Sequence, residues 1–146
     1  MKVSDNGLKL ICQFEGLRLE AYPDPATGGK PWTIGFGHTE GVKEGDTCTE
    51  EEAYDWLRED CEDAEHCIDD FVEVELNQNQ FDALVSFIFN LGCGNFKNST
   101  LLRLINSGQF NAAAQQFLRW NKAQGQVMAG LTARREMEAK LFLREV

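Results

Sequence analysis

The sequence predicts an α+β fold in which a small β-containing lobe is joined by a long helix to a larger helical lobe. Its 146 residues, 42% of them hydrophobic, suit one globular domain over 1–146 with its own core. Residues 21–39 combine turn signals with a run, Trp32–Thr39, in which bulky residues alternate with small or polar ones, and this is typical of a β-hairpin. The segments before and after this run repeat their apolar residues at helical spacing.

The first predicted helix spans residues 4–15. Ser4 or Asp5 can cap its start, and Gly16 offers a stop. Its apolar stripe consists of Leu8, Ile11 and Cys12. The next residue on this stripe is Glu15, and burying an ionised carboxylate is costly unless the group is paired. Glu15 therefore needs a partner or a function.

The β-containing lobe is predicted over residues 16–48. It holds Tyr22-Pro-Asp-Pro25, a turn signal at Thr27-Gly-Gly29 and the alternating run Trp32–Thr39. These features together predict a short, strongly turned hairpin.

A single long connecting helix is predicted over residues 49–75. Thr49 and Glu52 form a capping box at its start. Its apolar residues step by four and three positions: Leu57, Cys61, Ala64, Ile68 and Phe71. Most of its many carboxylates then lie on the other face, which is typical of a solvated helix surface.

The helical lobe is predicted over residues 76–146. Its first helix begins after Asn77, ends at Gly92 and is apolar enough to be central in the core. Three shorter helices are expected after it: Ser99–Asn106, Phe110–Trp120 and Leu131–Leu143. A glycine-containing loop around Gln124–Gln126 separates the last two. We expect a ligand cleft between the lobes.

The charge is unevenly distributed along the chain. The net charge is −10 overall, but it is 0 over residues 1–39, −14 over 40–75 and +4 over 76–146. This balance argues against a protein that coats nucleic acid, while the basic half could face an anionic polymer. An acidic mimic of DNA would use only residues 40–75 and would leave the other motifs unexplained.

The cysteines and histidines do not predict a metal site, because they form neither C-x-x-C nor H-x-x-x-H. The five cysteines are odd in number, so at least one is unpaired within the chain, and Cys67 with Cys93 is a possible disulfide. No window approaches the roughly 18 apolar residues of a membrane span, and residues 1–15 lack the sections of a signal peptide. We therefore expect synthesis in the cytoplasm and no stable membrane insertion.

Glu15, Asp24 and Thr33 stand nine residues apart. Glycoside hydrolysis needs two carboxyl groups in unlike surroundings, one protonated to donate to the leaving oxygen and one ionised. The helix-end position of Glu15 suits the donor, and the proline-flanked position of Asp24 suits the ionised partner. Spacing alone is a weak signal, since two acids and a threonine often occur this close together by chance.

Several motifs occur in one order along nearly the whole chain. In the first part they are Phe14-Glu-Gly-Leu-Arg18, Ala21-Tyr-Pro-Asp24 and Trp32-Thr-Ile-Gly-Phe-Gly-His-Thr39. In the second part they are Leu76–Leu84, Phe87–Gly92, Ser99–Leu102, Phe117–Asn121 and Gly130–Glu136. Together they resemble the phage-type lysozymes, the endolysin muramidases of glycoside hydrolase family 24, and so imply a lysozyme-like fold.

This resemblance implies a muramidase that cuts the β-1,4 bond between N-acetylmuramic acid and N-acetylglucosamine in peptidoglycan, for host lysis. It assigns Glu15 as the general acid, Asp24 as the carboxylate that activates water and Thr33 as the hydroxyl that positions the water. The family inverts at the sugar carbon, so the carboxyl groups should stand roughly 6.5–9.5 Å apart. No metal or organic cofactor is implied, and we expect a monomer whose access to the wall depends on a holin.

Four further residues are candidates for supporting roles. His38 is expected to be a hydrogen-bonded hinge or core residue, and Trp32 either core or a sugar platform. One of Arg134 and Arg135 is expected to pair with Glu15, and the sequence does not choose between them.

Two features depart from the family. The interval between Asp24 and Thr33 is longer than in its best-known members, which leaves the placement of Thr33 open, and the chain is acidic although it would act on an anionic wall. Two alternatives also stay open: a binding module that keeps the fold without the activity, and a membrane-tethered form with an anchor outside this sequence.

Overall fold

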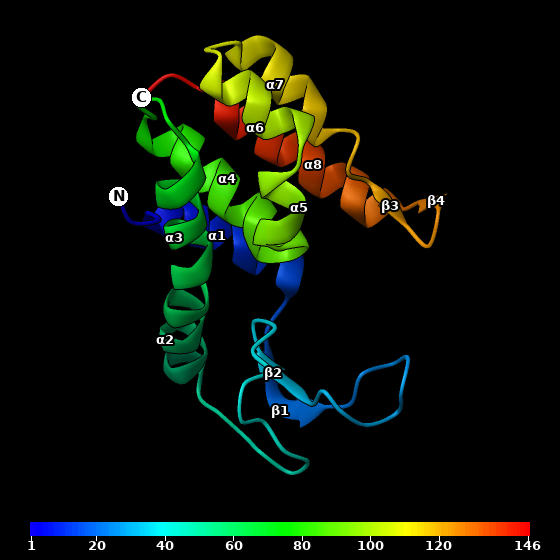
Figure 1. Ribbon diagram of the computed structural model, residues 1–146. Helices are drawn as coiled ribbons and strands as arrows, with labels where there is room; N and C mark the ends of the chain where they lie inside the picture. Colours follow the sequence, from blue (N-terminus) through cyan, green and yellow to red (C-terminus); the bar gives the residue numbers. More distant parts are fainter.

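The computed structural model describes all 146 residues and contains eight helices and two small antiparallel sheets. The strands β1 (Arg18–Tyr22) and β2 (Thr33–Gly35) lie apart from most helices, and the chain returns from them through α2 to the helical part (Figure 1). The remaining elements are α1 (Asp5–Glu15), α2 (Glu50–Asp60), α3 (Glu62–Phe71), α4 (Gln78–Leu91), α5 (Cys93–Lys97), α6 (Thr100–Asn106), α7 (Phe110–Phe117), β3 (Lys122–Ala123), β4 (Gln126–Val127) and α8 (Ala129–Leu143). The predicted α+β class is confirmed.

Helix α1 is anchored at its N-terminal end by buried carboxylates from other helices. Ser4 is its cap, accepting a hydrogen bond from the Gly7 amide. Asp82 of α4 accepts hydrogen bonds from the Ser4 amide, at 2.9 Å, and from the Ser4 hydroxyl. The Val3 amide donates to Glu65 of α3 at 2.7 Å. These contacts fix the helix whose other end is Glu15.

The first sheet pairs β1 with β2 in antiparallel register, Tyr22 opposite Thr33 and Arg18 opposite Gly35. A tight turn follows, closed by reciprocal backbone hydrogen bonds of 2.9 Å between Ile34 and His38. The predicted hairpin is confirmed, with its first strand starting at Arg18 instead of residue 21.

The predicted single helix over 49–75 is wrong, because the segment forms α2 and α3 with a turn at Cys61 between them. Helix α2 packs against β2, whereas α3 packs against α4 and α5. The buried stripe of Leu57, Cys61, Ala64 and Ile68 nevertheless continues through this turn, so the two helices share one apolar face. The Thr49–Glu52 capping box is present.

The helical lobe is built around α4, in which every residue from Phe81 to Ile88 is buried. Helices α1, α3 and α8 pack on it. The short helix α5 and the β3–β4 hairpin, which replaces the expected loop around Gln124–Gln126, were not predicted. None of the helices is both long and apolar enough to traverse a membrane.

Candidate active site

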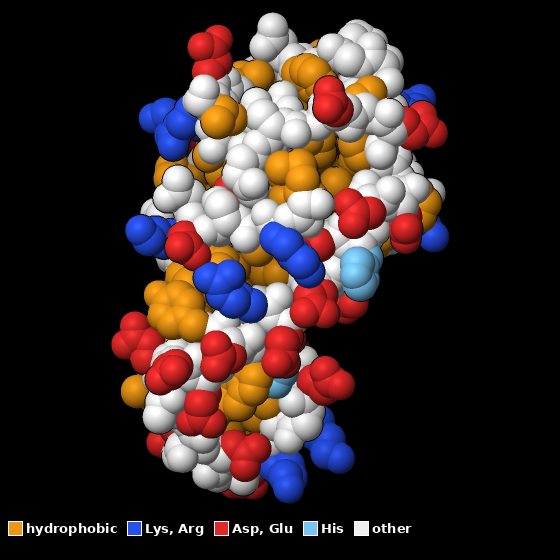
Figure 2. Space-filling model, turned by 90° about the vertical axis from the view of Figure 1, so that its left-hand side faces the viewer, with side chains coloured by type: hydrophobic (Ala, Val, Ile, Leu, Met, Phe, Trp, Pro, Cys, Tyr) orange, Lys and Arg blue, Asp and Glu red, His pale blue; other side chains and the backbone are white.

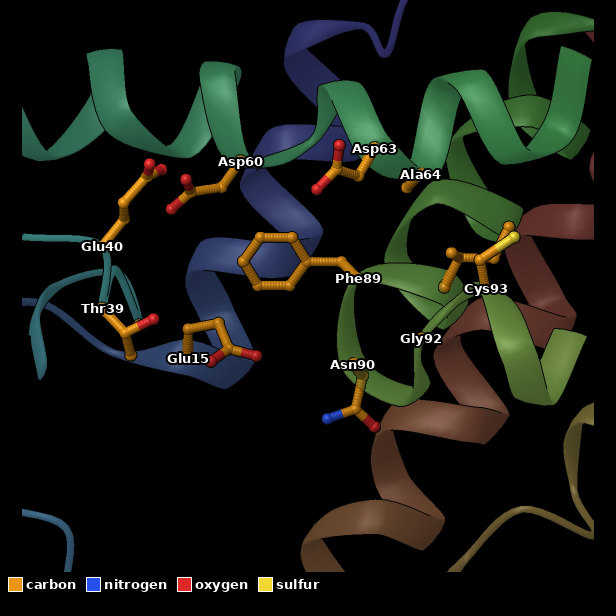
Figure 3. A pocket seen from close by; sticks show the side chains of 12 residues that line it. Glu15, Thr39, Glu40, Asp60, Asp63, Ala64, Phe89, Asn90, Gly92 and Cys93 are labelled. Carbon is orange, nitrogen blue, oxygen red and sulfur yellow. The ribbon is translucent and has the colours of Figure 1, made fainter. Parts of the chain in front are cut away.

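A cleft of about 700 Å³ lies where the β-containing part meets the helices. Its walls come from the end of α1, the turn after β2, the junction of α2 and α3, and the end of α4. Most of its lining residues are labelled in Figure 3: Glu15, Thr39, Glu40, Asp60, Asp63, Ala64, Phe89, Asn90, Gly92 and Cys93. The expected cleft between the lobes is therefore present.

Glu15 is the last residue of α1, and its carboxyl group faces this cleft (Figure 3). Gly16, with φ 73°, ends the helix. Gly37, with φ 83°, passes so near that a Cβ on it would lie 2.9 Å from Glu15 Oε1. Glycine at position 37 therefore makes room for the Glu15 carboxyl group.

Arg134 of α8 is the partner of Glu15, which resolves the choice between the two arginines. Its Nη1 donates to Glu15 Oε2 at 2.6 Å, and its side chain is only 4% exposed. Nε donates to Glu138 at 3.2 Å and Nη2 to the Ser86 carbonyl at 3.1 Å. A guanidinium held by partners on two helices orients the carboxyl group in turn.

Arg135 turns away from Glu15 into the core. It is fully buried, its Nη1 lies 3.2 Å from Glu138 Oε1, and Nη2 donates to Asn90. Burial raises the pKa of Glu138, against the opposing effect of Arg135 and Arg134. Burial likewise lowers the pKa of Arg135, which Glu138 opposes. Glu138 thus links both arginines below the floor of the cleft.

Asp24 and Thr33 lie at the end of the β1–β2 sheet and do not line the 700 Å³ cleft. Asp24 is half-buried, and its Oδ1 accepts from the Ala26 amide at 2.7 Å, which shapes the loop. Thr33 begins β2 opposite Tyr22, two residues before Asp24. The register therefore places the two residues at the same end of the sheet.

His38 and Trp32 differ in their surroundings. His38 is 8% exposed, shares a 2.8 Å hydrogen bond between Nδ1 and Asp60 Oδ2, and stacks on Trp56 with ring centroids 4.7 Å apart. It therefore ties the β2 turn to α2. Trp32 is half-buried and does not line the cleft.

Cys67 and Cys93 form a disulfide that joins α3 to the start of α5, with Cys93 at the edge of the cleft. Cys12, Cys48 and Cys61 are free thiols. Burial raises the pKa of all three, and that of Cys61 reaches about 12. No group of three His, Cys, Asp or Glu side chains could hold a metal ion.

Sequence reasoning missed three further carboxylates that line the cleft with Glu15: Glu40, Asp60 and Asp63 (Figure 3). Figure 2 shows many acidic side chains on the lower part of the side of the molecule where α2 and α3 lie. Because most carboxylates of residues 40–75 are solvated, the sequence did not distinguish the few that line the cleft. Sequence reasoning also missed Glu138, although its position in the helix could have indicated it. Like Glu15, Glu138 lies on the buried stripe of its helix, where the next buried residues, Leu141 and Phe142, are apolar.

Comparisons with known proteins identify the family of this chain. The profile of the phage lysozyme family matches residues 12–138. The endolysin of Salmonella phage P22 is 45% identical over 148 residues, covering 98% of this chain and 99% of its own length. The endolysin of Bacillus phage B103 is 46% identical, but this chain spans only about half of it, 54%.

Solved structures show the same similarity. The muramidase domain of SpmX from Asticaccaulis excentricus superposes with a TM-score of 0.91 at 42% identity, and a mutant of P22 lysozyme superposes with 0.89 at 43%. Each comparison covers 99% of both chains. With a profile that spans most of its length and near-complete relatives above 40% identity, this chain belongs to the phage lysozyme family.

Proposed function

We propose that this chain is an endolysin muramidase that hydrolyses the β-1,4 bond between N-acetylmuramic acid and N-acetylglucosamine in peptidoglycan. The observation that carries the proposal is Glu15, a carboxyl group at a helix end, facing an open cleft and held by the buried Arg134. Membership of the phage lysozyme family supports the same activity.

Glu15 acts as the general acid in this proposal. It donates a proton to the glycosidic oxygen as the bond to the leaving sugar breaks. Arg134 fixes the direction of the carboxyl group through Oε2. Gly37 leaves Oε1 free of side-chain crowding on the other side.

Asp24 activates the attacking water and Thr33 positions it. Their shared end of the β1–β2 sheet supports a joint role, because the strand register keeps both residues together. An inverting reaction needs a water between the two carboxyl groups, which requires a separation of roughly 6.5–9.5 Å when substrate is bound.

Reaching the wall requires passage across the inner membrane. We propose synthesis in the host cytoplasm, release by a holin and action in the periplasm as a monomer, without nucleic acid or a cofactor. The relatives from phages PS119 and PA-2, both 37% identical, are named SAR-endolysins. A membrane-tethered precursor is therefore the alternative route.

The test measures the release of reducing sugar ends from purified Gram-negative peptidoglycan. Glu15→Gln should lower the rate at least about 100-fold, because it removes the proton donor. Asp24→Asn should cause a loss of similar size. Glu20→Gln is the matched control, since Glu20 is an exposed residue of β1, and it should retain the parent rate.

Proton NMR of the first product separates inversion from retention at the sugar carbon. The α-anomer as the initial product supports inversion, whereas the β-anomer would exclude the water-activating role of Asp24. Binding of peptidoglycan by the parent without any release of reducing ends would favour the binding-module alternative.

A further inference from the structure

A second groove, of about 230 Å³, lies between α1 and α8 and is separate from the cleft. One wall is a stripe of α1: Asn6, Lys9, Leu10 and Gln13. The other is a stripe of α8 and its C-cap: Met137, Lys140, Leu141 and Arg144. Both stripes have the spacing of one helix face, so the groove runs between two helices.

The groove is cationic in a chain of net charge −10. Lys9, Lys140 and Arg144 line it, no acidic residue does, and none of these three takes part in an ion pair. Positive charges facing each other across a groove repel, and an anion between them relieves this repulsion. The groove therefore favours an anionic occupant.

The floor is apolar. Leu10 and Leu141 are each 7% exposed at its base, and Met137 adds a side chain that is 40% exposed. A purely polar anion would leave this surface uncovered, so the occupant needs an apolar side as well. The volume falls below the roughly 300–1,000 Å³ of small-molecule pockets and suits side chains inserted from a larger partner.

The spacing of the cations fits a helix. Lys140 and Arg144 stand four residues apart, which corresponds to about 6 Å along an axis. Carboxylates four residues apart on a partner helix have the same spacing, and an apolar residue between them would reach Leu10 and Leu141. A flat lipid surface would reach the rim but not the floor, and an anionic bilayer would repel the chain as a whole.

We propose that this groove docks an acidic amphipathic helix of a partner protein. Its apolar stripe enters between α1 and α8, and its carboxylates meet Lys9 on one side and Lys140 and Arg144 on the other. The same two helices carry Glu15 and Arg134, so a bound helix would bridge the elements that make the catalytic ion pair. The proposal is independent of the reaction at Glu15.

The probe is a terminally blocked helical peptide of 18 residues, with leucines along one stripe and glutamates beside them. Binding is followed by amide chemical shifts of the ¹⁵N-labelled protein. We expect a dissociation constant below about 1 mM, with chemical-shift changes concentrated on α1 and α8. A peptide with lysine in place of glutamate should not bind.

Charge reversal locates the site. Lys9→Glu with Lys140→Glu should weaken binding at least about tenfold, since two attractions become repulsions. Lys43→Glu with Lys97→Glu changes the net charge equally at exposed positions outside the groove and should change the affinity less than about twofold. The groove variant should instead bind the lysine peptide, which also shows that it is folded.

Three results would overturn the proposal: no binding of the acidic peptide at about 1 mM, equal weakening in both double variants, or binding without shifts in α1 and α8. Vesicles of phosphatidylglycerol provide the remaining arm. Groove-dependent binding to vesicles without peptide binding would make this face a lipid contact and would refute the helix partner.

Discussion

Replacing Gly37 with alanine tests whether the site depends on room beside Glu15. The added Cβ would lie 2.9 Å from Glu15 Oε1, closer than carbon and oxygen normally approach. The carboxyl group cannot simply swing away, because its other oxygen is held by Arg134 at 2.6 Å. Either the β2 turn or the carboxyl group must therefore move.

Two effects of different size should follow. With φ at 83°, alanine at this position should lower the free energy of unfolding by about 1–2 kcal/mol. If the carboxyl group is displaced by up to about 1 Å, the rate of reducing-end release should fall by about 100-fold. A destabilisation of this size leaves the protein folded, so it would not by itself explain the expected loss of activity.

Gly41→Ala is the matched control. Gly41 has a similar φ of 73°, but a Cβ there would meet nothing within 4 Å. Urea unfolding should give similar destabilisation for the two variants, while only Gly37→Ala loses activity. Full activity in Gly37→Ala, or an equal loss in both variants, would refute the steric argument.

Arg134→Met should lower the free energy of unfolding by about 3–5 kcal/mol in urea titrations, because the fully buried Glu138 loses one of its two guanidinium partners; a change below 1 kcal/mol would contradict this. Cys67→Ser should cost about 3–4 kcal/mol under oxidising conditions, from the 26-residue separation of the two cysteines, and almost nothing in the presence of a reductant. The Cys61 thiol has a folded pKa of about 12 against 9.0 unfolded, so its stabilising contribution is complete below pH 9 and is lost as the pH rises towards 12. Between pH 9 and 12 the free energy of unfolding of the parent should fall with pH more steeply than that of Cys61→Ala, by about 1.4 kcal/mol per pH unit. Parallel slopes would argue against the raised pKa of Cys61. Activity on peptidoglycan should fall as salt rises if the basic half of the chain attracts the wall, and a flat salt profile would exclude that attraction.

Local rules predicted the parts of the fold that depend on neighbouring residues. A cap at Ser4 or Asp5, the Thr49–Glu52 capping box and the apolar α4 follow from side chains a few positions apart. The structure contains the box and the apolar helix, and it has Ser4 as the cap. The position of Glu15 on an apolar stripe also predicted its need for a partner.

Features set by tertiary packing could not be predicted. The turn at Cys61 could not be found from the sequence, because the apolar spacing continues unbroken through it. Only the packing of α8 decides that Arg134 and not Arg135 reaches Glu15. The β3–β4 pair has two residues per strand, too few for alternation to show.

The ion pair between Glu15 and Arg134 joins residues that are 119 positions apart. Helix α8 leaves the ribosome after every other helix described, so a nascent chain holds Glu15 without the side chain that orients it. Contacts of this separation form late, since the intervening chain must first be ordered. The pairing of Glu15 with Arg134 is therefore completed only when α8 docks, and a partly made chain would hold Glu15 without its partner.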